Sequence, residues 1–222
     1  MAAESIPVVS DMHTFVIKRS NQHGLGCFAT KAITTGELVL LEEPMLSIRT
    51  SDVMDMQLCA SVLGEDMPSG YMAIYSLLEA YDGGLTACET FASGSRSLFD
   101  ATFLAEVDAV SRKLAQERGP ESADRCCGVL LKFKSNAWRA AGSMCLYEKY
   151  CRFNHSCRPN VCQEFKGASV EVRALCNVSA GEELYNTYLN AEQLHLTMTE
   201  RQRVIGETWG FRCDCERCTG EL

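Results

Sequence analysis

The stretch Arg152-Phe153-Asn154-His155-Ser156-Cys157-Arg158-Pro159-Asn160 decides how this chain is interpreted. It contains a polar triplet, a cysteine and a turn stiffened by proline. Ser156 or Cys157 beside His155 would imitate the nucleophile pair of a hydrolase. However, no nucleophile-elbow pattern surrounds them, and adjacent residues rarely point their side chains at each other. A histidine satisfied within the core is the simpler interpretation of these residues alone, so the choice depends on the rest of the sequence.

A second stretch near the C-terminus suggests a metal site. Cys213-Asp214-Cys215-Glu216-Arg217-Cys218 contains three thiols at a spacing that suits tetrahedral zinc, which needs a fourth ligand. Cys157 is the candidate, and a closed shell of four thiolates predicts a structural site rather than a catalytic one. Surface cysteines without metal and an iron–sulfur cluster are the alternatives, although the spacing is tighter than in common ferredoxins.

Composition narrows the class of protein. The 222 residues include 46% hydrophobic and 23% charged residues, as in an ordinary globular protein of one core. The net charge of −8 argues against nucleic acid as the main partner, because that affinity depends mostly on Lys and Arg. It is compatible with a basic peptide substrate.

The 13 cysteines raise the question of redox compartment. Residues 1–7 have neither the basic start nor the apolar core of a signal peptide, and no apolar run approaches membrane-spanning length. We therefore expect a reducing cytoplasm or nucleus, where clustered cysteines indicate metal more often than disulfides. The nine cysteines outside the metal set are expected to be small buried hydrophobes.

Strand patterns occur on both sides of a helical middle region. We expect strands at 13–18, at 38–44 with a continuation at 45–49, and at 184–189, and a short helix at 199–206. The strands at 161–165 and 169–175, joined by Lys166-Gly167-Ala168, are expected to form a hairpin with one exposed face. Tyr185 and Tyr188 lie three apart on the last strand, so we expect them to face opposite sides, one of them packed and one lining a pocket. A plain turn is the default interpretation of Gly24-Leu25-Gly26 by itself.

From residue 50 to 136 the apolar spacing becomes helical. Expected helices run around Val53 to Leu63, around Tyr71 to Leu78, along the face from Phe99 to Leu114, and from a cap at Asp124 through Phe133. Gly119-Pro120 ends the third. The fold class is therefore mostly β with an α insertion, that is, α+β.

Four motifs occur in a fixed order: Gly24-Leu25-Gly26, Asn154-His155-Ser156, Gly181-Glu182-Glu183-Leu184 with Tyr188, and the cysteine tail. In that order they resemble the SET-domain protein lysine methyltransferases, most closely the SET and MYND (SMYD) branch. The resemblance implies small twisted β-sheets around a pseudoknot, a helical insert and a zinc-binding post-SET tail. It divides one SET domain over 1–222 into 13–49, an insertion at 50–136, a C-terminal part at 137–190 and a post-SET segment at 191–222.

The resemblance also implies roles for individual residues. Contacts to S-adenosylmethionine would come from His23, Gly24, Leu25, Gly26, Asn136, Asn154, His155, Tyr188 and Phe211. Tyr188 would be catalytic, with Tyr185, Tyr188 and Trp209 lining a substrate channel. Cys157, Cys213, Cys215 and Cys218 would bind structural Zn²⁺. The implied activity is methylation of a lysine in a histone or another protein by a monomer that binds neither nucleic acid nor membrane.

Three departures from the SMYD pattern bear on this expectation. Cys59, Cys88, Cys126 and Cys127 lack the paired spacing of a MYND finger, and these 222 residues contain no long helical segment after Cys218. His23 and Leu25 replace basic residues that often flank the glycine loop. Trp209 replaces a second channel tyrosine, which predicts a changed product degree or weakened activity. The alternative function is therefore a weak or inactive SET-fold interaction module.

Overall fold

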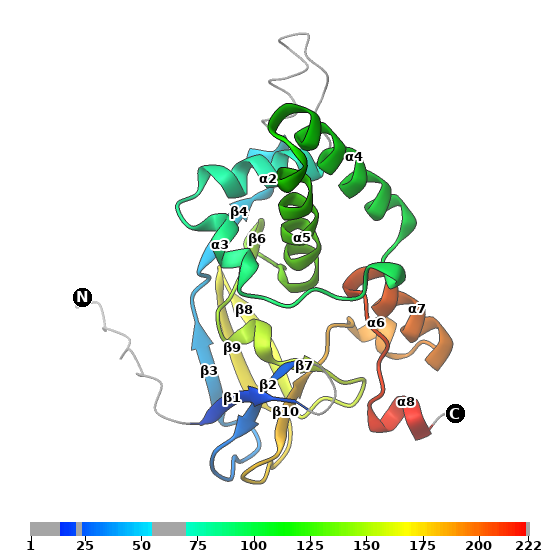
Figure 1. Ribbon diagram of the computed structural model, residues 1–222. Helices are drawn as coiled ribbons and strands as arrows, with labels where there is room; N and C mark the ends of the chain where they lie inside the picture. The colour runs from blue at the N-terminus through cyan, green and yellow to red at the C-terminus, as the bar shows by residue number, and fades with distance from the viewer. Residues whose placement is uncertain (1–13, 21–23, 55–69, 221–222) are drawn as a thin grey trace, which may run out of the picture.

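The computed structural model describes residues 14–20, 24–54 and 70–220. Small β-sheets lie below a group of helices in Figure 1, with the C-terminal helices on the right. The strands are β1 Phe15–Arg19, β2 Leu25–Ala29, β3 Leu38–Glu42, β4 Leu46–Arg49, β5 Trp138–Ala140, β6 Ser143–Leu146, β7 Asn154–His155, β8 Val161–Lys166, β9 Ser169–Ala174 and β10 Glu183–Asn186. The α-helices are α2 Gly70–Ala80, α3 Gly84–Glu89, α4 Ala101–Arg118, α5 Pro120–Asn136, α6 Ala191–Leu194, α7 Met198–Trp209 and α8 Glu216–Gly220, and the 3-10 turns are η1 Arg96–Leu98 and η2 Tyr150–Arg152.

One sheet brings the sequence motifs together. Its strand order is β1-β2-β10-β7, with β2 antiparallel and β7 parallel to β10. Tyr185 is opposite Asn154, and Asn186 is opposite His155. The strand after the glycine loop, the Asn-His pair and the Glu-Leu-Tyr strand are therefore neighbours, although they are far apart in the sequence.

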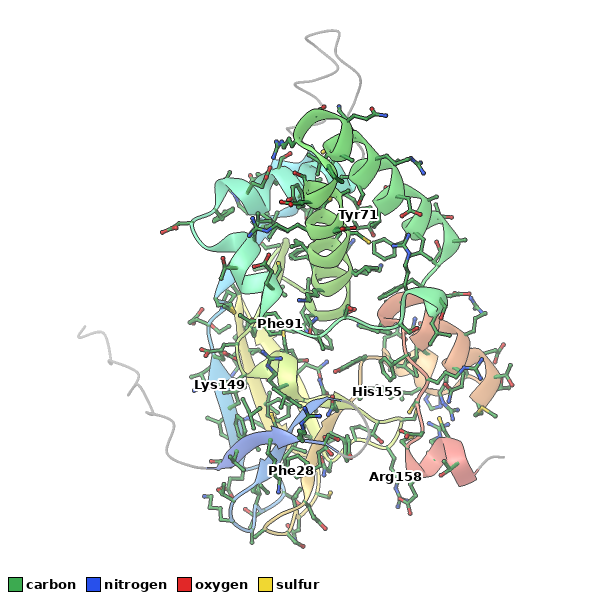
Figure 2. All side chains as sticks on the ribbon, in the orientation of Figure 1. Phe28, Tyr71, Phe91, Lys149, His155 and Arg158 are labelled. Carbon is green, nitrogen blue, oxygen red and sulfur yellow. The ribbon has the colours of Figure 1, made fainter. Side chains whose placement is uncertain are left out.

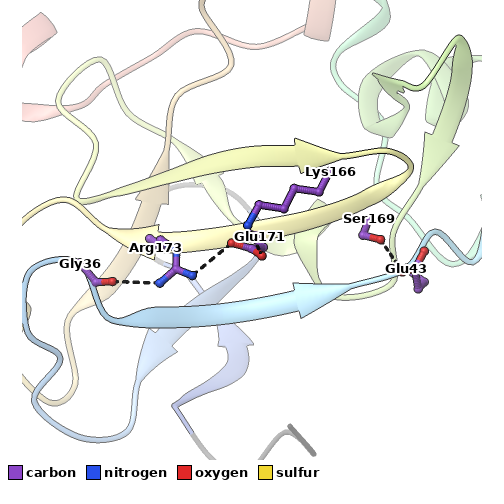
Figure 3. A network of polar contacts seen from close by, with 6 residues as sticks. All are labelled: Gly36, Glu43, Lys166, Ser169, Glu171 and Arg173. Carbon is purple, nitrogen blue, oxygen red and sulfur yellow. Dashed lines mark hydrogen bonds and ion pairs between the residues drawn. The ribbon is translucent and has the colours of Figure 1, made fainter. Parts of the chain in front are cut away.

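A second sheet, β3-β9-β8, follows the expected hairpin closely. Val170 and Val172 are fully buried, whereas Glu171 and Arg173 lie on the opposite face. Figure 3 shows Glu171 accepting hydrogen bonds from Lys166 at 2.7 Å and from Arg173 at 3.2 Å. Such surface ion pairs each contribute about 0–1 kcal/mol. Packing of the valine face therefore contributes more to this sheet than its polar network does.

The insertion is helical, as its periodicity predicts. Phe103, Val107, Val110 and Leu114 of α4 are buried in a core shared with α2, α3 and α5. The predicted start of α4 at Phe99 is wrong, because Asp100 is the N-cap and its carboxylate accepts from the backbone N–H groups of Thr102 and Phe103.

The other helix boundaries of the insertion also became clear only from the structure. Asp124 is not a cap, because Pro120 at the first turn of α5 restarts the helix directly after Gly119. Helix α3 is too short for a periodic signal and was not predicted. The expected helix from Val53 to Leu63 lies largely outside the described residues.

Two C-terminal boundaries differ from expectation in ways that affect the site. Strand β10 ends at Asn186, so Tyr188 lies beyond it rather than on it. The environments of Tyr185 and Tyr188 do differ, but not because of strand alternation. Helix α7 extends to Trp209, beyond the predicted 206, and begins with a capping box between Thr197 and Glu200.

The α+β class with small sheets and a helical insertion is confirmed. Within the described ranges, no helix has the length and apolarity to cross a bilayer. The division of the chain at residues 49, 136 and 190 stays a prediction.

Candidate functional site

The main candidate site is a cavity of about 630 Å³ between the sheets, the insertion and the C-terminal segment. Pockets for small molecules and cofactors typically occupy about 300–1,000 Å³. It is lined by Gly24, Leu25, Ala92, Ser93, Gly94, Ser95, Leu98, Ser135, Asn136, Cys151, Arg152, Asn154, Tyr188, Trp209, Gly210, Phe211 and Arg212. Segments that are far apart in the sequence therefore line one cavity.

A carboxylate orients Asn154 at one side of this cavity. The amide nitrogen of Asn154 donates to Glu183 Oε1 at 2.8 Å and to the carbonyl of Leu25 at 3.1 Å. Glu183 Oε2 accepts from Ser20 Oγ and from the Tyr185 hydroxyl, both at 2.8 Å. A Cβ at Gly26 would lie 2.9 Å from Asn154 Nδ2 and closer still to Glu183 Oε1. The glycine is therefore required for the Asn154–Glu183 pair to form.

Tyr188 is fixed at both ends. Its hydroxyl donates to the carbonyl of Phe153 at 2.9 Å, and its backbone N–H donates to His155 Nδ1 at 3.0 Å. Burial raises the pKa of the Tyr188 hydroxyl above its usual value. The phenol is therefore protonated at neutral pH and acts as a neutral hydrogen-bonding group rather than as a base.

Two more aromatic rings line the cavity beside Tyr188. The Trp209 ring lies 5.4 Å from that of Tyr188, and the Phe211 ring lies 6.1 Å from it. Both side chains are half-buried, so part of each ring faces the cavity. Flat faces of this kind suit stacking on a planar heterocycle.

The connector between α3 and α4 forms part of the wall and contacts the end of α7. The Ser95 N–H donates to the Gly210 carbonyl at 2.6 Å, and the Gly94 N–H donates to Ser135 Oγ at 3.1 Å. A Cβ at Gly94 would lie 2.7 Å from Gly210 Cα. Two glycines thus allow the two backbones to touch.

Tyr185 lines a different cavity. This second cavity, of about 660 Å³, is bordered by Lys18, Arg19, Phe28, Asn160, Glu182, Glu183 and Tyr185. Burial, together with the hydrogen bond to Glu183, raises the pKa of the Tyr185 hydroxyl. Glu183 lies between the two cavities, since it borders the second and holds Asn154 in the first.

Four buried thiols gather beside the first cavity. The sulfur atoms of Cys157, Cys213, Cys215 and Cys218 lie within 4.8 Å of one another. Cys157 and Cys218 are 3.6 Å apart, and the sulfurs of a tetrahedral zinc tetrathiolate are separated by about 3.8 Å. All four side chains are at most 5% exposed. The residues therefore fit a closed structural metal site.

The surroundings of the thiols are suited to negative charge. Arg201 is 1% exposed, and its guanidinium donates to Cys218 Sγ at 3.6 Å and to the Leu196 carbonyl at 2.7 Å. Hydrogen bonds from Cys157 and Cys213 lower the pKa of Cys215, whereas hydrogen bonding within the same cluster raises the pKa of Cys213. A zinc tetrathiolate carries a net charge of −2, which a buried cation partly offsets.

Comparison with known proteins identifies the family. The family model described as "SET domain" matches residues 24–189. This chain belongs to the SET-domain family. The match spans the first three of the four sequence motifs and the helical insertion, and the cysteine tail lies beyond it.

Curated relatives resemble a limited part of the chain. N-lysine methyltransferase SMYD2-B of Danio rerio is 33% identical over 76 residues, which is 34% of this chain and 17% of that protein. Histone-lysine N-methyltransferase set5 of Schizosaccharomyces pombe is 40% identical over 72 residues, which is 32% of this chain and 22% of that protein. The aligned part thus spans about a fifth of the length of these relatives.

Solved structures support the fold over most of the chain. The structure of Rubisco LSMT bound to AdoMet has a TM-score of 0.54 at 14% identity, covering 91% of this chain and 52% of that one. The SET domain of LSMT bound to lysine and AdoHcy has a TM-score of 0.53 at 13% identity, covering 92% and 54%. At this identity the likeness concerns the SET fold alone.

The SET-domain structure brings most predicted site residues together. The first cavity collects Gly24, Leu25, Asn136, Asn154, Tyr188, Trp209 and Phe211, and the four predicted metal ligands form their own cluster. Gly26 and His155 lie behind the cavity wall, and Tyr185 lies on the second cavity. His23 lies outside the described residues.

Several features of the site were missed or misjudged from sequence. The connector 92–98, Ser135, Cys151, Arg152 and Arg212 line the cavity without having been predicted, since only packing of the insertion brings the connector there. Arg152 and Arg212 provide positive charge in the cavity, although His23 and Leu25 stand where basic residues often flank the glycine loop. The expectation that His155 and Cys157 do not face each other was wrong, because His155 Nε2 lies 3.4 Å from Cys157 Sγ.

The prediction that the remaining cysteines are buried was also partly wrong. Cys162 and Cys176 are exposed, and Cys127 and Cys151 are partly buried. Cys162 lies on β8, whose residues alternate between the core and the surface. Burial raises the pKa of Cys151 to about 12, so this thiol in the cavity wall is protonated at neutral pH.

Proposed function

We propose that this SET domain is a protein-lysine N-methyltransferase that uses S-adenosylmethionine. The single observation that carries the proposal is the 630 Å³ cavity in which Asn154, Tyr188 and Phe211 meet, although they are far apart in sequence. The names of the relatives agree with this chemistry: N-lysine and histone-lysine methyltransferases among the sequences, and AdoMet-bound LSMT among the structures.

The lining residues match the parts of the cofactor. Half-buried Phe211 offers a ring face for the adenine, and Asn154, oriented by Glu183, presents its amide at the side of the cavity. Backbone at Gly24 and Leu25 would approach the methionine end, and Arg152 and Arg212, which line the same cavity, would provide positive charge for its carboxylate. Asn136 also lines the cavity, but its amide donates to the carbonyls of Ala92 and Lys132, so it would act mainly by shaping the wall.

In the reaction, the bound cofactor supplies an electrophilic methyl group on a sulfonium. The acceptor lysine must be neutral, which costs about 4–5 kcal/mol at pH 7 from its reference pKa of about 10.4. Enclosure by Tyr188, Trp209 and the apolar cavity wall would lower that pKa by desolvation. The Tyr188 oxygen would orient the transferred methyl group through weak C–H···O contacts, because its proton is already donated to the Phe153 carbonyl.

The acceptor is a lysine side chain of a histone or another protein. Tyr185 would belong to the approach to the site, in the second cavity, where Glu182 and Glu183 lie together with Lys18 and Arg19. The net charge of −8 supports a basic protein segment rather than nucleic acid as partner. We propose a monomer in the cytoplasm or nucleus, with zinc held structurally by the four cysteines.

Calorimetry of S-adenosylmethionine binding to zinc-loaded protein tests the proposal. We expect micromolar affinity that falls at least tenfold in Asn154→Ala, because this variant removes the oriented amide. Asn177→Ala is the matched control, since Asn177 is exposed and its side-chain oxygen accepts hydrogen bonds from Thr35, away from the cavity. Absence of binding by folded, zinc-loaded protein would contradict the enzymatic proposal and favour the interaction module.

A further inference from the structure

His155 occupies an unusual position for a residue that the resemblance assigns to the cofactor. It is 2% exposed and lies on β7, behind the cavity wall rather than in it. Its ring is 5.3 Å from that of Tyr188 and 6.0 Å from that of Phe211. Figure 2 labels it beside the C-terminal segment that carries the cysteines. The imidazole therefore lies between the cavity and the metal site.

The hydrogen bonds of the ring define its tautomer. His155 Nδ1 accepts from the Tyr188 backbone N–H at 3.0 Å, so Nδ1 carries a lone pair rather than a proton. In the neutral imidazole the proton is then on Nε2, which lies 3.4 Å from Cys157 Sγ. The ring thus donates toward the thiolate of a metal ligand and accepts from the residue that lines the cavity.

The backbone N–H of Tyr188 relies on its hydrogen bond to His155 because Tyr188 lies beyond the end of β10. Strand β10 ends at Asn186, so the Tyr188 N–H is not held by a neighbouring strand. The 153–157 segment instead holds both ends of the residue: Phe153 accepts from its hydroxyl, and His155 accepts from its backbone. The same segment ends at Cys157, one of the four cysteines of the metal site.

We propose that His155 is a positioning residue that couples metal occupancy of the four-cysteine site to the cofactor cavity. This inference rests on the proposed function, because it requires the cavity to bind the cofactor. With metal bound, Cys157 is a fixed thiolate acceptor for Nε2–H. Without it, no bond fixes the four sulfur atoms relative to one another, so Cys157 loses its fixed position, and the contacts from Cys157 to His155 and from His155 to Tyr188 weaken. Coupling of this kind is reciprocal for binding free energies, so cofactor binding must also strengthen metal binding, which we expect to observe as slower metal release.

Zinc release to a chromogenic chelator measures the coupling. In wild-type protein, we expect saturating S-adenosylhomocysteine to slow release about tenfold, within the roughly 5–150-fold range of such couplings. His155→Asn retains an oxygen near the Nδ1 position but cannot reach Cys157. His155→Gln retains a donor near the Nε2 position but leaves the Tyr188 N–H without its acceptor. Each variant removes one of the two ring contacts of His155, the one to Cys157 or the one to Tyr188. In both variants S-adenosylhomocysteine should therefore slow zinc release by less than about twofold.

His195→Asn is the matched control, because His195 is exposed at the end of α6, and it should retain the full slowing. Absence of cofactor binding to zinc-loaded wild-type protein overturns the proposed function and the coupling with it. Cofactor binding without slowing, or slowing retained in both His155 variants, overturns the coupling alone. If the variants do not retain zinc, wild-type protein tests the same link in reverse: equal cofactor affinity before and after zinc removal, with folding verified by circular dichroism, refutes it.

Discussion

Gly94→Ala tests whether the helical insertion is part of the binding cavity. Gly94 belongs to the connector that touches the end of α7, and its backbone has no positive φ that would itself exclude alanine. The added Cβ would lie 2.7 Å from Gly210 Cα and closer still to the Trp209 carbonyl oxygen. These neighbours are backbone atoms, so no side-chain rotation relieves the clash.

The magnitude follows from the displacement. Carbon atoms pack at about 3.5–4.0 Å, so the two backbones must separate by about 1 Å. The Ser95–Gly210 hydrogen bond, now 2.6 Å, would then exceed bonding distance. Overpacking costs about 1–3 kcal/mol and a lost hydrogen bond about 0.5–1.5 kcal/mol. We expect a destabilisation of about 2–4 kcal/mol, or a fall in Tm of about 5–15 °C for a chain of this length.

Thermal unfolding and cofactor calorimetry measure the effect. Cofactor affinity should fall about tenfold or more, because Trp209 and Gly210 line the same cavity. Gly128→Ala is the matched control within the insertion: a Cβ there meets nothing within 4 Å, and alanine in the interior of α5 should stabilise by about 0.5–1 kcal/mol. If Gly94→Ala unfolds at the temperature of Gly128→Ala and binds the cofactor as wild type does, the connector is not a wall of the site.

Three further substitutions test other parts of the site. Tyr188→Phe keeps the ring but removes the hydroxyl that donates to Phe153. Methyl transfer should fall about 100-fold, while cofactor affinity should stay within about threefold of that of the wild type. Equal turnover in both proteins would contradict the assigned role. Trp209→Tyr adds a hydroxyl beside Tyr188 that can hold the amine or a water, so mass spectrometry of the product should show fewer methyl groups per lysine, and an unaltered spectrum would refute this. Arg201→Met removes the buried cation beside Cys218 and should speed zinc release to a chelator about 10–100-fold. The control Arg203→Met changes an exposed arginine and should leave the release rate unchanged. Equal release rates in the two variants would show that the thiols do not depend on Arg201.

Local sequence patterns were enough to predict several of the strands and helices. Alternation in Val170-Glu171-Val172-Arg173 and the glycine turn before it predicted the β8–β9 hairpin, because each strand has one buried and one exposed face. The apolar period in α4 predicted its buried stripe in the same way. Boundaries depended on finer chemistry: the Asp100 cap and Pro120 decided where α4 and α5 begin.

The sequence by itself determined the types of elements, the motif order and the identity of the four thiols, since these depend on periodicity and on residue chemistry. Only the tertiary structure decided that Glu183 holds Asn154 against Gly26, that Gly94 touches Gly210, and that His155 joins Tyr188 to Cys157. These contacts depend on where chain segments with little mutual sequence signal come to lie. The packing of the whole chain determines such positions, and short-range patterns do not encode them.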